Sequence, residues 1–311
     1  MTKVFIDGSA GTTGLRIYER LGERSDLELI ILTGDKRKDL TARAEALNSA
    51  DIAFLCLPDD AAREAVTLIE NDRTVVIDTS TAHRTADGWA YGFPELTGQR
   101  ELIKNSKRIA NPGCHASGFI SLVKPLTENG IIPCDAIISA FSLTGYSGGG
   151  KKMIADYETD ELSEALLAPR SYGLSQTHKH LPEMSKICSL QKMPLFTPIV
   201  SSYYSGMEVV ITIAKEQING TLADIKNIYS NYYNGKIVKY RENADESGFL
   251  SASAFSGRDD MEISVFGNED RIMLVSRFDN LGKGASGAAI QNMNIVLGLN
   301  DATGLNIGES K

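Results

Sequence analysis

The stretch KVFIDGSAGTTG, from Lys3 to Gly14, runs from an apolar strand through a glycine-rich turn to the start of a helix. Glycines in such a turn let the backbone approach a pyrophosphate closely, and the N-terminus of the following helix attracts its negative charge. The spacing is G-x-x-G-x-x-G rather than G-x-G-x-x-G, so a plain strand–turn–helix connection remains the alternative. The predicted cofactor loop consists of Gly8, Ser9, Ala10, Gly11, Thr12, Thr13 and Gly14.

The rest of the N-terminal third alternates between strand-like and helix-like patterns. The run Ile52–Leu57 is apolar throughout, as expected of a parallel strand covered by helices on both faces. The alternation predicts an α/β protein with a Rossmann-type, doubly wound parallel sheet. The expected strands are Lys3–Ile6, Glu28–Leu32, Ile52–Leu57 and Thr74–Asp78, and the expected helices are Gly14–Leu21, Ala42–Ala46 and Asp59–Ile69.

The middle of the chain has a different pattern, in which several strand-like runs follow one another. Consecutive strands suit an antiparallel sheet, and the helical stretch Leu222–Tyr233 among them makes the predicted second domain α+β. The apolar run Ala285–Leu299 predicts a last helix. The expected strands are Ala136–Leu143, Met207–Ile213, Phe249–Ala254, Met261–Phe266 and Arg271–Arg277.

The composition narrows the class of protein. The chain has 311 residues, a formal net charge of -8 and no dense Lys/Arg face, which argues against a nucleic-acid partner. No apolar run approaches the roughly 20 residues that span a bilayer, and Asp7 and Gly8 interrupt the apolar N-terminus, so we expect a cytoplasmic protein without a signal peptide. The 4 cysteines form no C-x-x-C pair, which with only 4 histidines argues against a zinc site, and the cytosol disfavours disulfides.

The end of the second expected strand indicates the type of cofactor. An acidic residue at this position would bind the ribose 2′-hydroxyl of NAD, whereas Lys36, Arg37 and Lys38 offer cations for the 2′-phosphate of NADP. NADP, as NADPH, is therefore the predicted cofactor. Asp35 precedes the basic run and, as an acidic residue, would favour NAD instead. A solvated loop of mixed charge remains the alternative.

The motif NPGCHASG, residues 111–118, precedes a helical stretch at Phe119–Leu126. Cys114 would then lie at the N-terminus of a helix, where the dipole and the N–H groups of the first turn favour a thiolate. A buried structural thiol is the alternative. The other cysteines lack such surroundings and are expected to be structural: Cys56, Cys134 and Cys188.

The motif HKHLPE, residues 178–183, places two histidines just before a proline. Pro182 suits the first turn of a helix and should keep Leu181 extended. In an extended segment, the side chains of His178 and His180 would share one face. Imidazole has a pKa suited to moving a proton near neutral pH, and a surface or hydrogen-bonded histidine is the alternative.

The motif YSGGGKK, residues 146–152, follows the strand expected at Ala136–Leu143. Glycines expose backbone N–H groups and the lysines add positive charge, which suits a phosphate or a carboxylate. The order and spacing differ from those of a Walker A motif, and a flexible surface loop is the alternative.

At these motifs the chain resembles the N-acetyl-γ-glutamyl-phosphate reductases of arginine biosynthesis, in their shorter form. The resemblance runs along nearly the whole chain and rests on its motifs taken together. Besides the motifs at 111–114, 145–151 and 178–184, these are FLCLPDD at 54–60, STAHR at 80–84, YGFPEL at 91–96 and NLGKGASGAA at 280–289.

The resemblance implies a Rossmann NADP-binding domain at residues 1–113, completed by the C-terminal helix at about 281–311, and a catalytic and dimerisation domain at 114–280. It implies the related fold of the aspartate-semialdehyde and glyceraldehyde-phosphate dehydrogenases, and a homo-oligomer, either dimer or tetramer. The family usually has an aromatic residue directly after the cysteine and a threonine two residues further on, where this chain has His115 and Ser117. His115 is therefore a second candidate base.

The implied chemistry is the NADPH-dependent reduction of an acyl phosphate to an aldehyde and phosphate, through a thioester on Cys114. We expect His180 to handle the proton, because it is nearer the helix start and can meet Glu183, which we also expect in the substrate site. His178 is expected to bind the anionic group of the substrate. The other expected residues are Arg84, Ser147 and Lys151 for the substrate phosphate, His83 for orienting the segment beside Arg84, and Pro58 for the cofactor.

Two functions of other classes remain open at this point. A non-enzymatic NADP-binding regulator would keep the glycine loop but would not need Cys114. A thiol hydrolase would use Cys114 and a histidine without a nicotinamide. Among the reductases, aspartyl phosphate or an acyl phosphate one carbon longer is the closest competing substrate, because one methylene is worth only about 1–3 kcal/mol in a pocket.

Overall fold

The computed structural model describes residues 1–308, and the chain divides into two units. The first unit consists of Met1–Pro112 and Ala285–Leu305, so a late segment of the chain returns to the fold that the first residues build. The second unit consists of Gly113–Gly284 and the described residues that follow Leu305.

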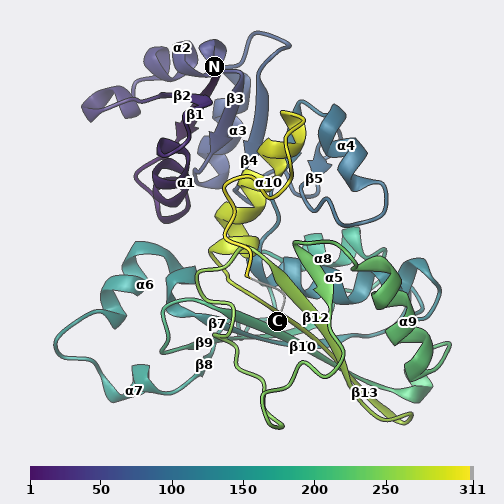
Figure 1. The fold of residues 1–311 in the computed structure, drawn as a ribbon. Coiled ribbons are helices and arrows are strands. Elements are labelled where there is room, and N and C mark those ends of the chain that lie inside the picture. Colours follow the sequence, from purple (N-terminus) through teal and green to yellow (C-terminus); the bar gives the residue numbers. More distant parts are fainter. Residues whose placement is uncertain (309–311) are drawn as a thin grey trace. The chain divides into compact units, whose positions relative to one another are not determined.

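The first unit is built on a six-stranded parallel sheet. Its strands are β1 (Thr2–Asp7), β2 (Leu27–Ile30), β3 (Ile52–Leu55), β4 (Val75–Asp78), β5 (Ala90–Tyr91) and β6 (Arg108–Ala110). They lie in the order β2-β1-β3-β4-β6-β5, so the strand order reverses beside β1 (Figure 1). Doubly wound sheets bind their ligands at the carboxyl end of the strands at such a reversal. The predicted Rossmann-type sheet is confirmed.

Helices cover both faces of this sheet, because the side chains of each strand point alternately to either side. Val4 and Ile6 of β1 pack with residues of α1 and α10, whereas Phe5 packs on the other face with residues of α2 and α3. Both faces are therefore apolar, which explains the continuous apolar runs of the strands. The helical elements are α1 (Thr12–Gly22), η1 (Gly34–Arg37), α2 (Leu40–Ser49), α3 (Asp59–Thr67), α4 (Gln99–Asn105) and α10 (Gly287–Val296).

The second unit contains a seven-stranded sheet in the order β11-β12-β13-β10-β7-β9-β8. The strands are β7 (Ser139–Gly145), β8 (Arg170–Ser171), β9 (Leu195–Ser201), β10 (Met207–Ala214), β11 (Val238–Tyr240), β12 (Met261–Gly267) and β13 (Arg271–Phe278). The expected antiparallel pairing holds for β10 with β7 and β13, for β12 with β13 and for β8 with β9, but the sheet is mixed, because β7 pairs with β9 and β11 pairs with β12 in parallel. Parallel neighbours need a long connection, and the chain from β7 to β9 supplies one that contains three helices.

Helix α5 (Cys114–Glu128) packs against β10 and β13 of this sheet. A Cβ atom at Gly118 would lie 2.4 Å from Val209 Cγ2 and 2.9 Å from Phe278 Cε1, so glycine allows the helix to lie close to the strands. The other helical elements are η2 (Tyr146–Gly149), α6 (Gly150–Tyr157), α7 (Glu164–Leu167), α8 (Leu181–Ile187), η3 (Lys215–Gln217) and α9 (Leu222–Tyr232). Within residues 1–308, none of the helices has both the length and the apolar character that crossing a membrane requires.

Two local predictions in this unit are wrong. The stretch Phe249–Ala254 is not a strand: Phe249 is 77% exposed, and the N–H of Ala254 donates to the carbonyl of Ser251 as in a turn. Hydroxyl-bearing residues favour such turns, which outweighs the apolar residues around them. Leu181 is not extended either but begins α8, because the preference of a residue before proline is weaker than the burial of this side chain in the core.

Candidate active site

Cys114 is the first residue of α5, and Gly113 precedes it in an extended conformation as the N-cap. The N-cap is a glycine and makes no side-chain capping bond, and the thiol lies at the positive end of the helix dipole, next to the backbone N–H groups of the first turn. The thiol is half-buried. A Cβ atom at Gly284 would lie only 3.0 Å from the Cβ of Cys114, so a glycine keeps the space beside this residue open.

Glu183 holds the turn in front of Cys114. It lies in the first turn of α8 and is 2% exposed. Its Oε2 atom accepts the N–H of Gly113 at 3.2 Å. A buried carboxylate bonded to the residue before the thiol fixes how the chain enters α5.

Three of the four histidines of the chain gather within the second unit. The ring of His115 lies 5.5 Å from that of His178 and 5.7 Å from that of His180, measured between centroids. His178 and His180 lie 4.7 Å apart with their rings nearly perpendicular. The sequence motif thus brings its two histidines together, in a turn rather than in the expected extended segment.

His115 has both ring nitrogens engaged. Nδ1 lies 2.6 Å from Ser142 Oγ and Nε2 lies 2.6 Å from the hydroxyl of Tyr172. Burial, followed by the charges of His178 and Lys179, lowers the pKa of His115 from 6.5 to about 3. The ring is therefore neutral near neutral pH, and its nitrogens are occupied by protein groups.

Tyr172 is a neighbour of Cys114 that no sequence motif indicates. Burial, and after it the charge of Cys114, raises the pKa of the Tyr172 hydroxyl above its ordinary value. Tyr172 follows β8 and Ser142 lies on β7, so both reach His115 through the pairing of distant strands. No spacing in the sequence signals either residue.

The glycine-rich loop that follows β7 is ordered by backbone bonds. The N–H groups of Tyr146 and Ser147 donate to the carbonyls of Tyr203 and Tyr204, each at 3.0 Å. Ser147 is buried, and its Oγ accepts a bond of 3.0 Å from Asn280 Nδ2. Lys151 lies in α6 and is exposed. The expected phosphate loop is thus a fixed turn with a solvent-facing cation rather than a flexible surface loop.

The remaining cysteines do not share the surroundings of Cys114. Burial raises the pKa of the Cys56 thiol to about 12, and it raises that of Cys188 as well. Cys134 is exposed, and its sulfur accepts a bond from Gln191 Nε2 at 3.2 Å. Neither burial nor a surface loop activates a thiol.

In the first unit, the loop between β1 and α1 leaves no room for side chains at two of its glycines. A Cβ atom at Gly8, where φ is +87°, would lie 2.2 Å from the carbonyl oxygen of Cys56. A Cβ atom at Gly14 would lie 2.4 Å from the carbonyl oxygen of Gly8. Gly11 is the N-cap of α1 and makes no side-chain capping bond. A backbone without side chains at these glycines and the N-terminus of the helix fit the pyrophosphate of a dinucleotide.

The other expected cofactor residues follow the two strands that flank β1, the strand before the glycine loop. Lys36, Arg37 and Lys38 are exposed in and after η1, which follows β2 beside β1. Pro58 is the N-cap of α3, which follows β3 on the other side of β1. The basic run therefore lies at the edge of the sheet where the strands end and ligands bind.

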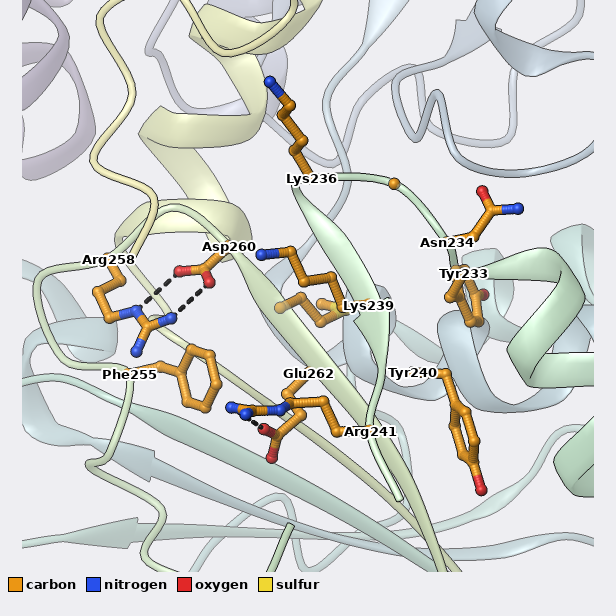
Figure 2. A pocket seen from close by; sticks show the side chains of 12 residues that line it. Tyr233, Asn234, Lys236, Lys239, Tyr240, Arg241, Phe255, Arg258, Asp260 and Glu262 are labelled. Atoms are coloured by element: carbon orange, nitrogen blue, oxygen red, sulfur yellow. Dashed lines mark hydrogen bonds and ion pairs between the residues drawn. The ribbon is translucent and has the colours of Figure 1, made fainter. Parts of the chain in front are cut away.

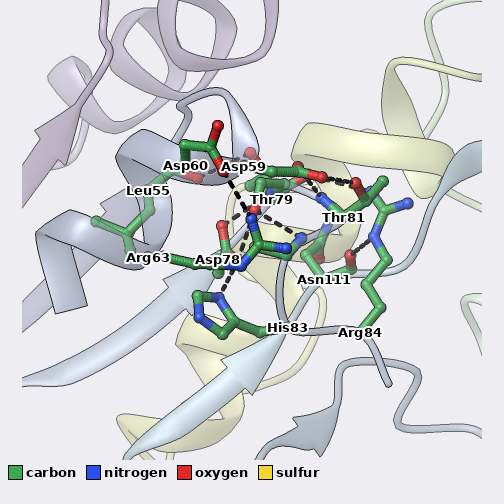
Figure 3. Close-up of polar contacts among 12 residues, drawn as sticks. Leu55, Asp59, Asp60, Arg63, Asp78, Thr79, Thr81, His83, Arg84 and Asn111 are labelled. Carbon is green, nitrogen blue, oxygen red and sulfur yellow. Dashed lines mark hydrogen bonds and ion pairs between the residues drawn. The ribbon is translucent and has the colours of Figure 1, made fainter. Parts of the chain in front are cut away.

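A network of polar contacts holds the segment after β4 (Figure 3). Asp78 Oδ2 lies 2.6 Å from His83 Nδ1, and the ring of His83 stacks on Trp89 at 4.0 Å. Arg84 donates from Nε to the carbonyl of Asn111 at 2.9 Å and from Nη2 to the carbonyl of Thr79 at 3.1 Å. Two nitrogens of Arg84 are thus engaged by the backbone at the carboxyl ends of the strands.

An ion pair that the sequence did not indicate lies directly before the glycine loop. Arg43 of α2 donates from Nε and Nη2 to Asp7 Oδ2, at 3.0 and 2.9 Å, and from Nη1 to Glu64 at 2.9 Å. Burial raises the pKa of Asp7, while Arg43 opposes the rise. The arginine thus compensates a buried negative charge directly before the glycine loop.

Comparison with known families matches both units. Residues 3–106 match the family model described as the NAD binding domain of semialdehyde dehydrogenase, and residues 114–280 match its dimerisation domain. A protein of Nostoc sp. named N-acetyl-gamma-glutamyl-phosphate reductase 2 is 46% identical over 97% of this chain and 99% of its own length. A Brucella suis protein named N-acetyl-gamma-glutamyl-phosphate reductase is 45% identical over 95% of this chain and 99% of its own.

Solved structures share the fold at low sequence identity. The aspartate semialdehyde dehydrogenase II of Vibrio cholerae, solved in complex with ASA, superposes with a TM-score of 0.71 at 17% identity over 96% of this chain and 98% of that one. The aspartate semialdehyde dehydrogenase of Candida albicans, solved with NADP, has a TM-score of 0.67 at 14% identity, again over 96% and 98%.

Proposed function

Since the chain belongs to the N-acetyl-γ-glutamyl-phosphate reductases and carries both semialdehyde dehydrogenase domains, we propose that Cys114 is the nucleophile of its reaction. The activity is the NADPH-dependent reduction of N-acetyl-γ-glutamyl phosphate to N-acetyl-glutamate 5-semialdehyde and phosphate, in arginine biosynthesis. The single observation that carries the role of Cys114 is its position as the first residue of α5, directly before His115 of the histidine cluster.

The chemistry starts on the sulfur. The Cys114 thiolate attacks the acyl carbon, the bond from that carbon to the phosphate oxygen breaks, and phosphate leaves with the electron pair. NADPH, when bound, supplies the hydride that brings the acyl group to the oxidation level of the aldehyde. The oxygen of the resulting thiohemiacetal needs a proton partner until it re-forms a carbonyl, and the thiolate then leaves again.

We assign this proton to His180 and the recognition of the anionic group of the substrate to His178. His180 directly precedes α8, at the turn whose Glu183 also holds Gly113 in front of the nucleophile. Imidazole exchanges protons near working pH. His115 is not suited to this role because both its nitrogens bind protein groups and burial keeps it neutral. Its task is to hold Tyr172 beside Cys114.

The substrate phosphate is assigned to Ser147 and Lys151, with Arg84 as a further cation. The bond from Asn280 orients the Ser147 hydroxyl, and Lys151 adds an exposed positive charge next to the glycines. Glu183 acts in the same site through its bond to Gly113.

The cofactor is assigned to the loop Gly8–Gly14, with Pro58 beside it and the 2′-phosphate on Lys36–Lys38. What supports this is the lack of space for side chains at Gly8 and Gly14 and the basic run beside them. Replacing the three basic residues by alanine should weaken NADPH binding far more than NADH binding in a fluorescence titration. Equal losses of affinity for NADPH and NADH would mean that Lys36–Lys38 are solvated surface residues that do not bind the 2′-phosphate.

We further infer that two copies of this cytoplasmic protein associate through the outer face of the second sheet, as a dimer or within a tetramer. Phe141 of β7 lies opposite Val210 of β10 on that face. Phe141 is 44% exposed and Leu195 of β9 is 55% exposed, so the face offers apolar area for burial against a second copy.

The deciding experiment omits NADPH. The protein is mixed with N-acetyl-γ-glutamyl phosphate, phosphate release is followed over time, and the chain is analysed by mass spectrometry. We expect a burst of about one phosphate per Cys114 and an acyl adduct on that residue, with neither in Cys114→Ala. Continued phosphate release would identify a thiol hydrolase. The absence of a burst would indicate a non-enzymatic NADP-binding regulator. With NADP and phosphate, N-acetyl-glutamate semialdehyde should be oxidised with a higher kcat/KM than aspartate semialdehyde.

A further inference from the structure

Ser142, His115 and Tyr172 form a chain of hydrogen bonds that ends beside the nucleophile. Ser142 Oγ lies 2.6 Å from Nδ1 of His115, and Nε2 of the same ring lies 2.6 Å from the Tyr172 hydroxyl. The charge of Cys114 acts on that hydroxyl, so the chain ends close to the thiol. It depends on His115, the residue that stands where this family usually has an aromatic residue after the cysteine.

The number of protons in this chain limits how they can be arranged. His115 is neutral because burial lowers its pKa to about 3, so only one of its ring nitrogens carries a proton. The Tyr172 hydroxyl keeps its proton, since burial and, after it, the charge of Cys114 raise its pKa. Ser142, the ring and Tyr172 thus supply one proton each, whereas the two hydrogen bonds between them use only two. One of the two hydroxyls must direct its proton elsewhere.

Burial decides which hydroxyl this is. Ser142 is 0% exposed, and its Oγ makes no other hydrogen bond within residues 1–308. A buried donor without an acceptor costs about 1–3 kcal/mol, so Ser142 donates to Nδ1 of His115. The proton of the ring is then on Nε2, which donates to the oxygen of Tyr172. The half-buried Tyr172 is therefore left to direct its own proton into the site of Cys114.

We propose that Tyr172 is a further catalytic residue, which donates a hydrogen bond to the acyl oxygen of the substrate while that oxygen is negatively charged. This inference rests on the proposed role of Cys114 as the nucleophile. When the bond between the sulfur and the acyl carbon forms, the π electrons of the carbonyl move to its oxygen. When they return, the bond from the carbon to the phosphate oxygen breaks and phosphate leaves.

Tyr172 keeps its proton throughout these steps, so the transfer of a proton remains with His180. Ser142 and His115 are positioning residues, because they fix the direction of the O–H bond of Tyr172. A donor that is fixed before the reaction stabilises the charged oxygen without having to reorient.

The test compares two reactions of Cys114, of which only one creates a charged oxygen. The first is the phosphate burst with N-acetyl-γ-glutamyl phosphate in the absence of NADPH, followed by rapid mixing. The second is alkylation of the thiol by iodoacetamide, which displaces iodide without forming an oxyanion and is followed by mass spectrometry. A purely structural role of Tyr172, or a role in ionising the thiol, would change both rates alike. The proposed role changes the burst alone.

The changed proteins are Tyr172→Phe, Ser142→Ala and Ser142→Thr. The matched control is Tyr240→Phe, which removes the hydroxyl of another tyrosine of the same unit. Tyr240 lies on β11 at the edge of the sheet, where it lines a cavity (Figure 2), and β12, β13 and β10 separate it from β7. Its buried hydroxyl has no hydrogen-bond partner among the residues that the structure describes.

We expect Tyr172→Phe to slow the burst by about 10²–10³-fold, the usual loss for one donor to an oxyanion, and to leave alkylation within about twofold of wild type. Ser142→Ala should slow the burst by about tenfold, because the ring can then carry its proton on either nitrogen. Ser142→Thr keeps a hydroxyl and should restore the burst, and Tyr240→Phe should match wild type in both reactions.

An unchanged burst in Tyr172→Phe, or equal losses in burst and alkylation, would overturn the proposal. A wild-type protein that shows no burst would instead overturn the role of Cys114, so the two failures can be told apart.

Discussion

The neutral, buried His115 should make the protein sensitive to acid. Its pKa is about 3 in the folded chain against an ordinary value of 6.5, with burial as the largest cause. A folded-state pKa below the unfolded one means that the unfolded chain binds the proton more readily between these two values. The contribution of the neutral His115 to the free energy of unfolding is therefore fully present above about pH 6.5 and is lost as the pH falls toward 3.

The size of the loss follows from the same two values. Between about pH 7 and about pH 5, the unfolded histidine becomes almost fully protonated while His115 in the fold remains neutral. The free energy of unfolding should fall by about 2 kcal/mol over this interval from this residue alone. That is a large share of the roughly 5–15 kcal/mol by which a typical domain is stable.

The assay compares urea unfolding of wild type and His115→Gln at the two pH values. Glutamine does not titrate, and its amide can still bond to Ser142 and Tyr172. The variant will differ in absolute stability, so the informative quantity is the difference between the two pH values for each protein. Wild type should lose about 2 kcal/mol more than His115→Gln. Parallel losses would refute the argument and would mean that His115 is protonated in the fold or is not buried.

The remaining predictions concern the reaction. Cys114→Ala should abolish turnover, while NADPH binding, followed by fluorescence, stays nearly intact. Cys114→Ser should also be inactive, because a serine hydroxyl is not ionised near neutral pH. Activity in either variant would show that the Cys114 thiol is not the nucleophile. His180→Asn should lower kcat by about 10²–10⁴-fold, whereas His178→Asn should mainly raise KM, and steady-state kinetics showing the opposite split would exchange the two roles. Gly14→Ala should weaken NADPH binding by about tenfold or more, because its Cβ would lie 2.4 Å from the carbonyl oxygen of Gly8; Gly22→Ala, where nothing lies within 4 Å, is the control and should bind normally.

The parts of the molecule that could be predicted are those that neighbouring residues determine. The strand, turn and helix around Gly8–Gly14 are encoded within one short stretch, and so is the start of α5 at Cys114. The doubly wound sheet follows from alternating patterns because parallel strands need crossover helices, whatever their exact ends. Phe249–Ala254 shows the limit of this reasoning, since apolar residues without a neighbouring strand to pair with form turns.

The parts that could not be predicted depend on strand pairing over long separations. Tyr172 and Ser142 meet at His115 because β7 and β8 both pair with β9, and no local pattern contains that fact. The bond from Glu183 to Gly113 joins residues 70 positions apart. The expected link from His180 to Glu183 followed from their closeness in sequence, whereas the bond that Glu183 makes to Gly113 follows from the packing of α8 beside α5.

The three clustered histidines show how surroundings, rather than residue type, decide a role. His115 directly follows Cys114 and is the second candidate base after His180. On a helix, however, consecutive side chains point about 100° apart, and this rotation carries the imidazole away from Cys114 toward Ser142 and Tyr172. At this position burial keeps the imidazole ring neutral, and both of its nitrogens are bonded to protein groups. A group that binds a proton only near pH 3 is not suited to donate one to the oxygen of a thiohemiacetal at neutral pH, which supports our proposal that His180, in the turn before α8, supplies the proton.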